Sequence, residues 1–502
     1  MSRAEKIALA ISILAFIAAA WISLSIFEGI PHLEDEFAYV WQAQVIASGE
    51  LTIPSPPEPK SFLVPFVVDY QGSRFGKYPL GWPVILSLGE IIGARWLVNP
   101  LLAGFCVWFT TRLGSKLLGN TVGLLAAGLT ASSPFFLMNS GVLLSHPLGL
   151  FFALVFCVAW LDAMQDKSNL PAWLPTLTAG GALGALGLTR PFTALGLAVP
   201  FFIHGIIILF RGNVEIKRRV ISIGILTLLV SSLHLLWQYA VTGDPTQNPY
   251  TLWWEYDKIG FGPGVGVTES GHSLKYAYQN LKFSLNAGYS DLFGWYRISW
   301  VFLPFGLWSL RKSGKTWPVV AVAPVLILIY LAYWVGAWVL GPRYYFEGLF
   351  SLTITTAAGI AMLAGLPLKA DRPILTMKGK NRFRLMAVIS VVALLVFSNL
   401  FFYLPLRIGE MRHMFGVSRQ QLVPFEQPEV EAFTPALIIV ITENWRDYAV
   451  LLEGSSPTLD SPFIFAWDRG PGPNQRVLDS FPDRTAYFYH PEDPWVFYRI
   501  KQ

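Results

Sequence analysis

Three consecutive carboxylates, Glu34, Asp35 and Glu36, follow the first membrane-length apolar run of the chain. That run, residues 8–27, is long enough to cross a bilayer, because about 20 residues at about 1.5 Å each cover a hydrocarbon core of about 30 Å. Carboxylates at a membrane boundary are costly unless they pair or act on a ligand. Here they begin a long polar loop that water can reach, and this combination predicts chemistry at the outer surface of a membrane.

Basic and aromatic side chains occur at the same predicted membrane level. Arg74, Lys77 and Tyr78 end the first outer loop, whereas His146, Arg190 and Arg343 lie at the outer ends of later apolar runs, with Glu347 four residues after Arg343. These positions are distant in sequence but share one level. Acids beside isolated bases at one level predict a cleft for an anionic, lipid-linked substrate.

Each of these residues could also have a purely structural role. Asp35 could cap a helix that starts at Phe37, because Asp is a good N-cap residue. Arg190 and Arg343 could snorkel to lipid phosphates, although the proline beside each indicates a helix break that faces inward. His146 could cap a helix and Arg74 could be solvated, and an interfacial aromatic belt rather than a substrate wall could be formed by Trp253, Trp254 and Tyr256.

The composition predicts the elements that position these residues. Of the 502 residues, 53% are hydrophobic and 14% are charged, and the charged share is about half that of a soluble protein. Apolar runs centred near residues 103, 130, 154, 181, 200, 230, 304, 328, 356 and 395, with the first, predict about 11 spans. The chain is therefore predicted to be an all-α polytopic membrane protein. Both cysteines, Cys106 and Cys157, lie in apolar runs, which excludes a disulfide framework.

Basic residues predict the orientation. With the N-terminus cytoplasmic, the inner loops hold Arg3, Lys6, Arg112, Lys116, Lys167, residues 211–219, residues 311–315, and Lys369, Arg372, Lys378, Lys380, Arg382 and Arg384. The short outer turns are nearly free of Lys and Arg, which is a strong positive-inside pattern. An odd number of spans then leaves the C-terminus outside. The sequence has no Asn-x-Ser/Thr acceptor site, which favours a prokaryotic cell membrane.

Two domains are predicted. Residues 1–405 form the transmembrane domain, with outer loops at about 28–95 and 241–297 and a short interfacial helix near 81–93. Residues 406–502 form a small extracytoplasmic α/β domain, because charge rises there and β-like runs occur at 436–442, 462–467, 485–489 and 495–500.

An ordered set of motifs carries a family resemblance. Asp35-Glu36-Phe-Ala-Tyr39 resembles the Asp-Glu-x-x-Tyr that opens the first outer loop of type C membrane glycosyltransferases, the superfamily of protein O-mannosyltransferases and lipid A aminoarabinose transferases. Lys77-Tyr-Pro-Leu-Gly-Trp82 is similar to the stretch that closes that loop. Gly187-Leu-Thr-Arg-Pro191 and Gly341-Pro-Arg-Tyr-Tyr345 resemble later elements of the superfamily. One departure is His146, where many relatives carry an acid.

The resemblance implies a hexosyl- or pentosyltransferase that moves a sugar, with inversion, from polyprenyl phosphate to a lipid, glycan or protein acceptor. Asp35 would be the general base, with Glu36 orienting it or binding the acceptor. Arg343, Arg190, Lys77 and Arg74 would bind the donor phosphate. His146, Tyr39, Tyr78, Trp82, Tyr344 and Glu347 would line the acceptor or sugar pocket. No nucleotide cofactor or nucleic acid is expected, and a divalent metal is left open, because Asp35, Glu36, His146 and Glu347 could hold one only if they converge.

Two different functions compete with this interpretation. A polytopic transporter or lipid flippase would place charges near the midplane of broken helices, whereas the charges here lie at span ends and in outer loops. An O-antigen ligase or polymerase would also use lipid-linked sugars, but with an oligosaccharide on pyrophosphate as donor.

Overall fold

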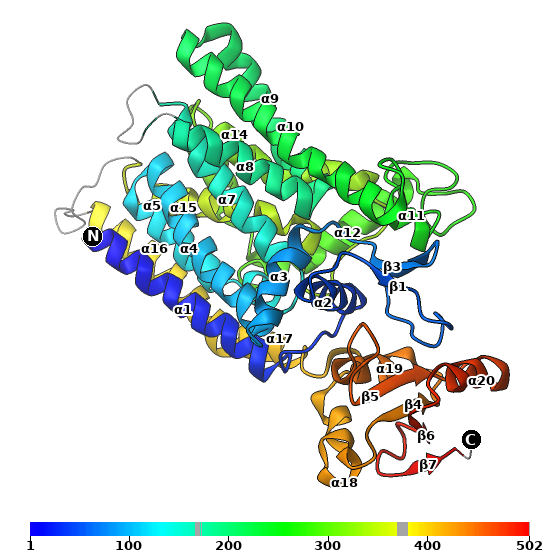
Figure 1. The fold of residues 1–502 in the computed structure, drawn as a ribbon. Coiled ribbons are helices and arrows are strands. Elements are labelled where there is room, and N and C mark those ends of the chain that lie inside the picture. The colour runs from blue at the N-terminus through cyan, green and yellow to red at the C-terminus, as the bar shows by residue number, and fades with distance from the viewer. Residues whose placement is uncertain (166–170, 172, 369–379, 501–502) are drawn as a thin grey trace.

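The structure, a computed structural model, describes residues 1–165, 171, 173–368 and 380–500. The described residues up to 409 form a helical bundle, and residues 410–500 form a small α/β unit, called the C-terminal unit, beside one end of it (Figure 1). Lys167, Lys369, Arg372 and Lys378, on which the predicted orientation partly rests, lie outside the described residues.

Several helices of the bundle begin at residues that favour a helix N-terminus. Ser2 and Glu5 form a capping box on the first helix, and Pro191 starts another, where its missing N–H costs nothing. In chain order the helices are α1 (Arg3–Ser25), α2 (Glu34–Ala47), α3 (Gly81–Ile91), η1 (Arg95–Leu97), α4 (Val98–Leu118), α5 (Asn120–Ala131), α6 (Pro134–Gly141), α7 (His146–Ala163), α8 (Trp173–Thr189), α9 (Pro191–Arg211), α10 (Val214–Thr242), α11 (Pro249–Trp253), α12 (Leu274–Asp291), η2 (Tyr296–Ile298), α13 (Leu303–Leu310), α14 (Trp317–Ile329), η3 (Tyr330–Ala332), η4 (Arg343–Gly348), α15 (Leu349–Leu363), α16 (Lys380–Ser398), η6 (Asn399–Tyr403) and α17 (Leu404–Gly409).

Among the described residues, six helices are long and apolar enough to cross a membrane, and the bent pair α5–α6 would make a seventh. This count is lower than the predicted one because several apolar runs form short or interrupted helices. The runs near residues 304 and 328, for example, form α13 and α14, which have 8 and 13 residues. The short helix predicted near residues 81–93 is α3, and its position at the membrane interface stays a prediction. One continuous apolar core joins the helices of the bundle.

The loop between α2 and α3 carries a small antiparallel sheet. Its strands are β1 (Ile53–Pro54), β2 (Val67–Tyr70) and β3 (Ser73–Gly76), in the order β1-β3-β2. In Figure 1 this sheet lies beside α2, between the bundle and the C-terminal unit.

The four β-like runs predicted in the tail are strands of one mixed sheet. β4 (Ala436–Val440) pairs in parallel with β5 (Phe463–Trp467) and β6 (Thr485–Tyr489), and β7 (Phe497–Arg499) is antiparallel to β6. Alternate residues of β4 enter two separate clusters, one on each face. The helices of this unit are η7 (Met414–Gly416), η8 (Arg419–Glu426), α18 (Pro428–Glu431), α19 (Trp445–Leu451), η9 (Leu452–Gly454) and α20 (Pro471–Ser480).

Candidate functional site

Several segments that are far apart in the sequence meet around one cavity of about 610 Å³. They are the start of α2, the end of the first outer loop, the start of α7, the α8–α9 junction, the region from α11 to residue 259, and residues 330–344. The wall is strongly aromatic, with Tyr39, Phe66, Tyr78, Phe192, Tyr250, Trp254, Tyr330, Tyr333, Trp334 and Tyr344. The charged residues that line it are Glu34, Asp35, Lys77, Arg190, Asp257, Lys258 and Arg343. A cavity of this size with a few charged groups has the character of a ligand site.

Asp35 projects into this cavity from the first turn of α2. Its Oδ2 lies 3.1 Å from Nη2 of Arg343, and the hydroxyl of Tyr78 donates a hydrogen bond to its Oδ1. Burial raises the pKa of Tyr78 well above its usual value, so this phenol keeps its proton and remains a donor. The two partners fix the direction of one carboxylate that is still partly open to the cavity.

Arg343 keeps one donor for something other than Asp35. Its Nη1 atom is buried and has no hydrogen-bond partner among the residues that the structure describes. Arg343 also lies in the cavity wall. An unpaired, buried guanidinium N–H is costly, and a ligand anion in the cavity would satisfy it.

Glu36 points away from the cavity. Its Oε2 accepts hydrogen bonds from the backbone N–H groups of His32 and Leu33, and its Oε1 accepts one from Leu143. Burial raises the pKa of Glu36 to about 7, against the effect of these donors. The side chain therefore anchors the start of α2 to the chain before α7.

The prediction that Asp35 could cap a helix starting at Phe37 is wrong. α2 begins three residues earlier, at Glu34, with Leu33 at the N-cap position, and the backbone of that residue is bound by Glu36. The capping function thus belongs to the third acid of the motif, and the second is free for other contacts.

A buried cluster stands behind another part of the wall. Oε1 of Glu347 lies 2.9 Å from Nε of Arg190 and 3.2 Å from Nδ1 of His146. Glu347 is fully buried, and it fits because residue 149 of α7 is Gly: a Cβ there would come within 2.7 Å of Oε1. Arg190 and His146 themselves line the cavity. Glu347 therefore orients two cavity residues rather than facing a ligand.

Lys77 faces the cavity from an aromatic cage. Its Nζ lies 3.1 Å from Oδ2 of Asp257, and 3.9 Å and 4.8 Å from the ring centroids of Phe66 and Trp254. The indole N–H of Trp334 donates to the other oxygen of Asp257, at 3.1 Å. Burial lowers the pKa of Lys77, and the charge of Asp257 opposes this effect. The ion pair ties the end of the first outer loop to the second.

Besides Glu36 and Glu347, two more of the residues predicted for the site lie outside the cavity wall. Arg74 is buried against the C-terminal unit, where it donates to the carbonyl oxygen of Phe62. Trp82 is fully buried, and its indole N–H donates to the carbonyl oxygen of Leu143, at 2.8 Å. Both belong to the packing around the first outer loop and not to the cavity wall.

The cavity also contains residues that the sequence did not single out. Asp257 is a lone acid in a long aromatic loop, and Tyr330, Tyr333 and Trp334 lie in a run with no recognisable motif. Trp254, for which the sequence allowed a place in a substrate wall, does line the cavity. The only sequence signal for the others was the density of aromatic residues in the outer segments.

No three His, Cys, Asp or Glu side chains gather as a metal-binding group within the described residues. The four residues that could have formed such a group do not converge, because Asp35 is paired with Arg343, Glu36 with backbone N–H groups, and Glu347 with Arg190 and His146.

Solved structures with little sequence identity share the fold of this chain. ArnT from Cupriavidus metallidurans, bound to undecaprenyl phosphate, matches with a TM-score of 0.59 and 13% identity, over 96% of this chain and 92% of that one. The oligosaccharyltransferase AglB from Archaeoglobus fulgidus, in complex with an inhibitory peptide and a dolichol-phosphate, matches with a TM-score of 0.53 and 13% identity, over 90% of this chain and 64% of that one. No protein-family model matches the chain, and no curated protein matches its sequence.

The chain therefore shares its fold with ArnT and AglB, in agreement with the family resemblance of its ordered motifs. The match to ArnT extends over nearly the whole of both chains, so it includes the C-terminal unit as well as the helical bundle.

Proposed function

We propose that this protein transfers a sugar from a polyprenyl-phosphate donor to an acceptor outside the membrane. The observation that carries the proposal is a carboxylate and a guanidinium in one cavity, 3.1 Å apart, with the second guanidinium nitrogen unpaired among the described residues. Solved proteins of this fold bind undecaprenyl phosphate or dolichol-phosphate, which supports a lipid phosphate as the anion.

The acid–base part of the reaction falls to Asp35. Its carboxylate removes the proton of an acceptor hydroxyl as that oxygen attacks the anomeric carbon, and general-base help of this kind contributes about 10²–10⁴ in rate. The bond between the anomeric carbon and the phosphate oxygen breaks on the opposite face, with inversion. Arg343 and Tyr78 hold the carboxylate in direction during this step.

The leaving phosphate gains negative charge as that bond breaks. Arg343 supplies the free donor, and Arg190 and Lys77 line the same cavity while each is paired with a carboxylate, of Glu347 and Asp257 respectively. Arginine suits this role because its fork matches the geometry of phosphate oxygens. The aromatic wall fits a sugar ring, since apolar faces of sugars pack against such side chains, and His146, Tyr39 and Tyr344 are the polar groups that would contact its hydroxyls.

We propose the arrangement in the membrane that the sequence predicts. The N-terminus is cytoplasmic, and the cavity and the C-terminal domain predicted for residues 406–502 are extracytoplasmic. Shorter helices such as α13 and α14 belong to two different crossings, on either side of the inner loop at residues 311–315, and about 11 crossings result. The inner clusters of Arg and Lys that the structure describes, for example residues 211–219 at the α9–α10 turn, support this orientation.

A direct assay can test the transfer. The protein, purified into lipid nanodiscs, is incubated with a panel of undecaprenyl-phosphate-linked pentoses and hexoses and with an envelope extract as acceptor source, and release of undecaprenyl phosphate is followed by mass spectrometry. We expect turnover of at least one donor, and we expect Asp35→Asn to lower it by about 10²–10⁴. The matched control is Glu50→Gln, an exposed acid beyond the other end of α2.

Full turnover in the Asp35→Asn protein would remove that residue from the role. No turnover of any donor, together with movement of the intact lipid between leaflets of a vesicle, would instead favour a flippase.

A further inference from the structure

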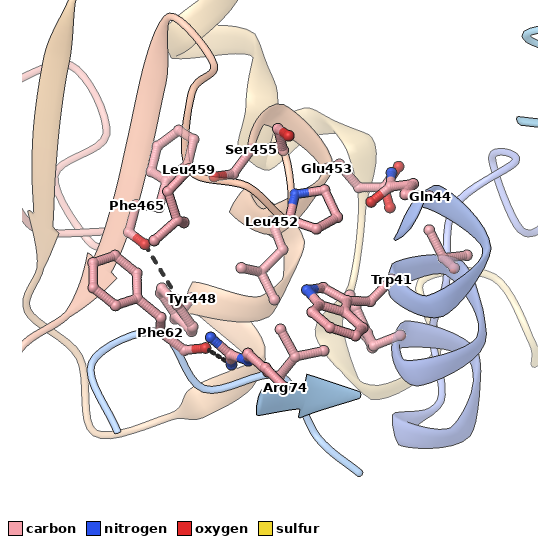
Figure 2. A pocket seen from close by; sticks show the side chains of 15 residues that line it. Trp41, Gln44, Phe62, Arg74, Tyr448, Leu452, Glu453, Ser455, Leu459 and Phe465 are labelled. Atoms are coloured by element: carbon pink, nitrogen blue, oxygen red, sulfur yellow. Dashed lines mark hydrogen bonds between the residues drawn. The ribbon is translucent and has the colours of Figure 1, made fainter. Parts of the chain in front are cut away.

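The C-terminal unit packs against the helix that carries the acidic motif. Figure 2 shows the seam: Trp41 and Gln44 of α2 lie on one side, and Tyr448, Leu452 and Glu453 of the C-terminal unit lie on the other. The apolar clusters of this unit also include Ile30 and Phe62, which belong to the segments just before and after α2. The unit thus shares its core with the surroundings of α2.

One polar contact across this seam reaches the acidic motif itself. Nη2 of Arg446, on α19, lies 3.1 Å from Oε1 of Glu34, and each side chain is about one-third exposed (31% and 34%). The guanidinium is held in place by aromatic rings, with its Cζ 4.7 Å from the centroid of Phe415. The neighbouring Trp445 packs edge-on against Phe37 of α2, at 5.9 Å.

The three acids of the motif therefore have three separate partners. Glu34 is paired by the C-terminal unit, Asp35 by η4 and the first outer loop, and Glu36 by backbone N–H groups before α2 and α7. Only the first of these pairs depends on the C-terminal unit, and it lies one residue before the proposed base.

We infer that Arg446 is a positioning residue for Asp35, acting through Glu34, so that the C-terminal unit completes the active site. The effect of Arg446 on catalysis rests on the proposed function, whereas its effect on the position of the first turn of α2 does not. Glu34 and Asp35 both line the cavity, and both belong to the first turn of α2. Fixing the first carboxylate from outside limits the rotation of that turn, and the positive charge of Arg446 offsets the negative charge of Glu34 beside the proposed base.

A second ion pair joins the same two parts of the chain without touching α2. Arg476 on α20 pairs with Glu58 of the first outer loop, and Arg469 donates to the carbonyl oxygen of Lys60, at 2.9 Å. Loss of the Arg476 pair would loosen the docking of the C-terminal unit but would leave Glu34 bound. It is therefore the matched control for a purely structural effect.

The first test measures α2 directly and needs no substrate. Hydrogen–deuterium exchange of the peptide covering residues 33–41 is compared in the full-length wild type, Arg446→Ala, Arg446→Lys and Arg476→Ala, all in nanodiscs. We expect faster exchange of that peptide in Arg446→Ala, partial protection in Arg446→Lys, and wild-type exchange in Arg476→Ala. Equal exchange in all four proteins, or equal acceleration in Arg446→Ala and Arg476→Ala, overturns the inference.

The second test uses turnover of the donor found in the panel assay. Arg446→Ala should lower kcat about tenfold with little change in KM for the donor, because a small misplacement of a reacting group costs rate rather than ground-state binding. The decisive comparison is the double variant: in the Glu34→Gln background Arg446→Ala should have no further effect, whereas an additive effect would show that Arg446 does not act through Glu34. If the wild type transfers no sugar, the proposed function fails, and the exchange experiment still decides the positioning.

Discussion

Removal of the Arg343 side chain should weaken binding of the lipid phosphate. Nη2 of this residue is bound to Asp35, and Nη1 is buried without a partner among the described residues, so one charge-assisted hydrogen bond to phosphate is available. Such a bond contributes about 1.5–3 kcal/mol. At about 1.4 kcal/mol for each tenfold change in affinity, Arg343→Ala should raise the Kd for undecaprenyl phosphate by about 10- to 150-fold.

Two companion variants separate the phosphate contact from the contact with Asp35. Arg343→Lys keeps the charge but lacks the fork, so its affinity should fall between those of the wild type and Arg343→Ala. Asp35→Asn removes the ion pair but no phosphate donor, and we expect its Kd to be unchanged or lower, since a negative charge near the phosphate is removed. Weaker binding in the two Arg343 variants, but not in Asp35→Asn, would assign the loss of affinity to the guanidinium group of Arg343.

Native mass spectrometry of the purified protein titrated with undecaprenyl phosphate is a suitable assay. Arg407→Ala is the control, because Arg407 is paired with Asp291 at 3.0 Å and does not line the cavity. A Kd for Arg343→Ala within about twofold of the wild type, in a protein with an unchanged melting temperature, would refute the phosphate contact, because it corresponds to less than about 0.5 kcal/mol.

Three further perturbations test the surroundings of the cavity. Glu347→Gln leaves Arg190 buried without its counter-ion and should destabilise the protein by about 3–5 kcal/mol, seen as a lower melting temperature. The control, Glu410→Gln, removes an exposed ion pair and should have little effect. Equal melting temperatures of the two variants would show that the buried pair of Glu347 and Arg190 does not stabilise the fold. Asp257→Asn removes the charge that raises the pKa of Lys77 against burial, so Lys77 should lose its proton at lower pH, and undecaprenyl phosphate binding measured across alkaline pH should fall earlier than in the wild type. The pKa of Glu36 is raised to about 7, against 4.5, so between these pH values the folded protein holds a proton that the unfolded chain does not. The stability of the folded protein should therefore fall as pH rises through that window and then level off. Glu36→Gln should lack this pH dependence of the melting temperature from pH 5 to 8, and an unchanged dependence would assign it to another group.

Much of the helical architecture follows from local sequence patterns. Long apolar runs such as residues 8–27 form helices, because a helix satisfies all of its own backbone hydrogen bonds where lipid offers none. The β-like runs of the tail form β4 to β7 because β-branched and aromatic residues alternate or cluster between turn residues. The number of crossings was less predictable, since Pro and Gly inside an apolar run decide whether it forms one long helix or two short ones. Pro134 is an example: it starts α6, which is bent by 58° from α5.

The position of a site residue was predictable where the neighbouring sequence determines which way its side chain points. It was not predictable where a contact with a distant segment determines this. Arg343 and Arg190 lie beside prolines that break helices, and both line the cavity. Trp82 also lies beside a proline in one of the family motifs, but its indole N–H donates to the carbonyl oxygen of Leu143, 61 residues away, and this contact holds the side chain in the core. The partner of Lys77, Asp257, is 180 residues away, and no local pattern could have paired them.

The consecutive carboxylates of α2 are not interchangeable, although they are the same kind of group. Successive residues on a helix project about 100° apart, so Glu34 is bound by the C-terminal unit at the wall of the cavity, Asp35 is bound by Arg343 within it, and Glu36 reaches the chain before α7. Inserting one neutral residue between Glu36 and Phe37 would keep all three acids and yet send the wrong acid to each of these partners. In this protein the phase of one short helix, rather than the number of acids, determines which carboxylate meets Arg343.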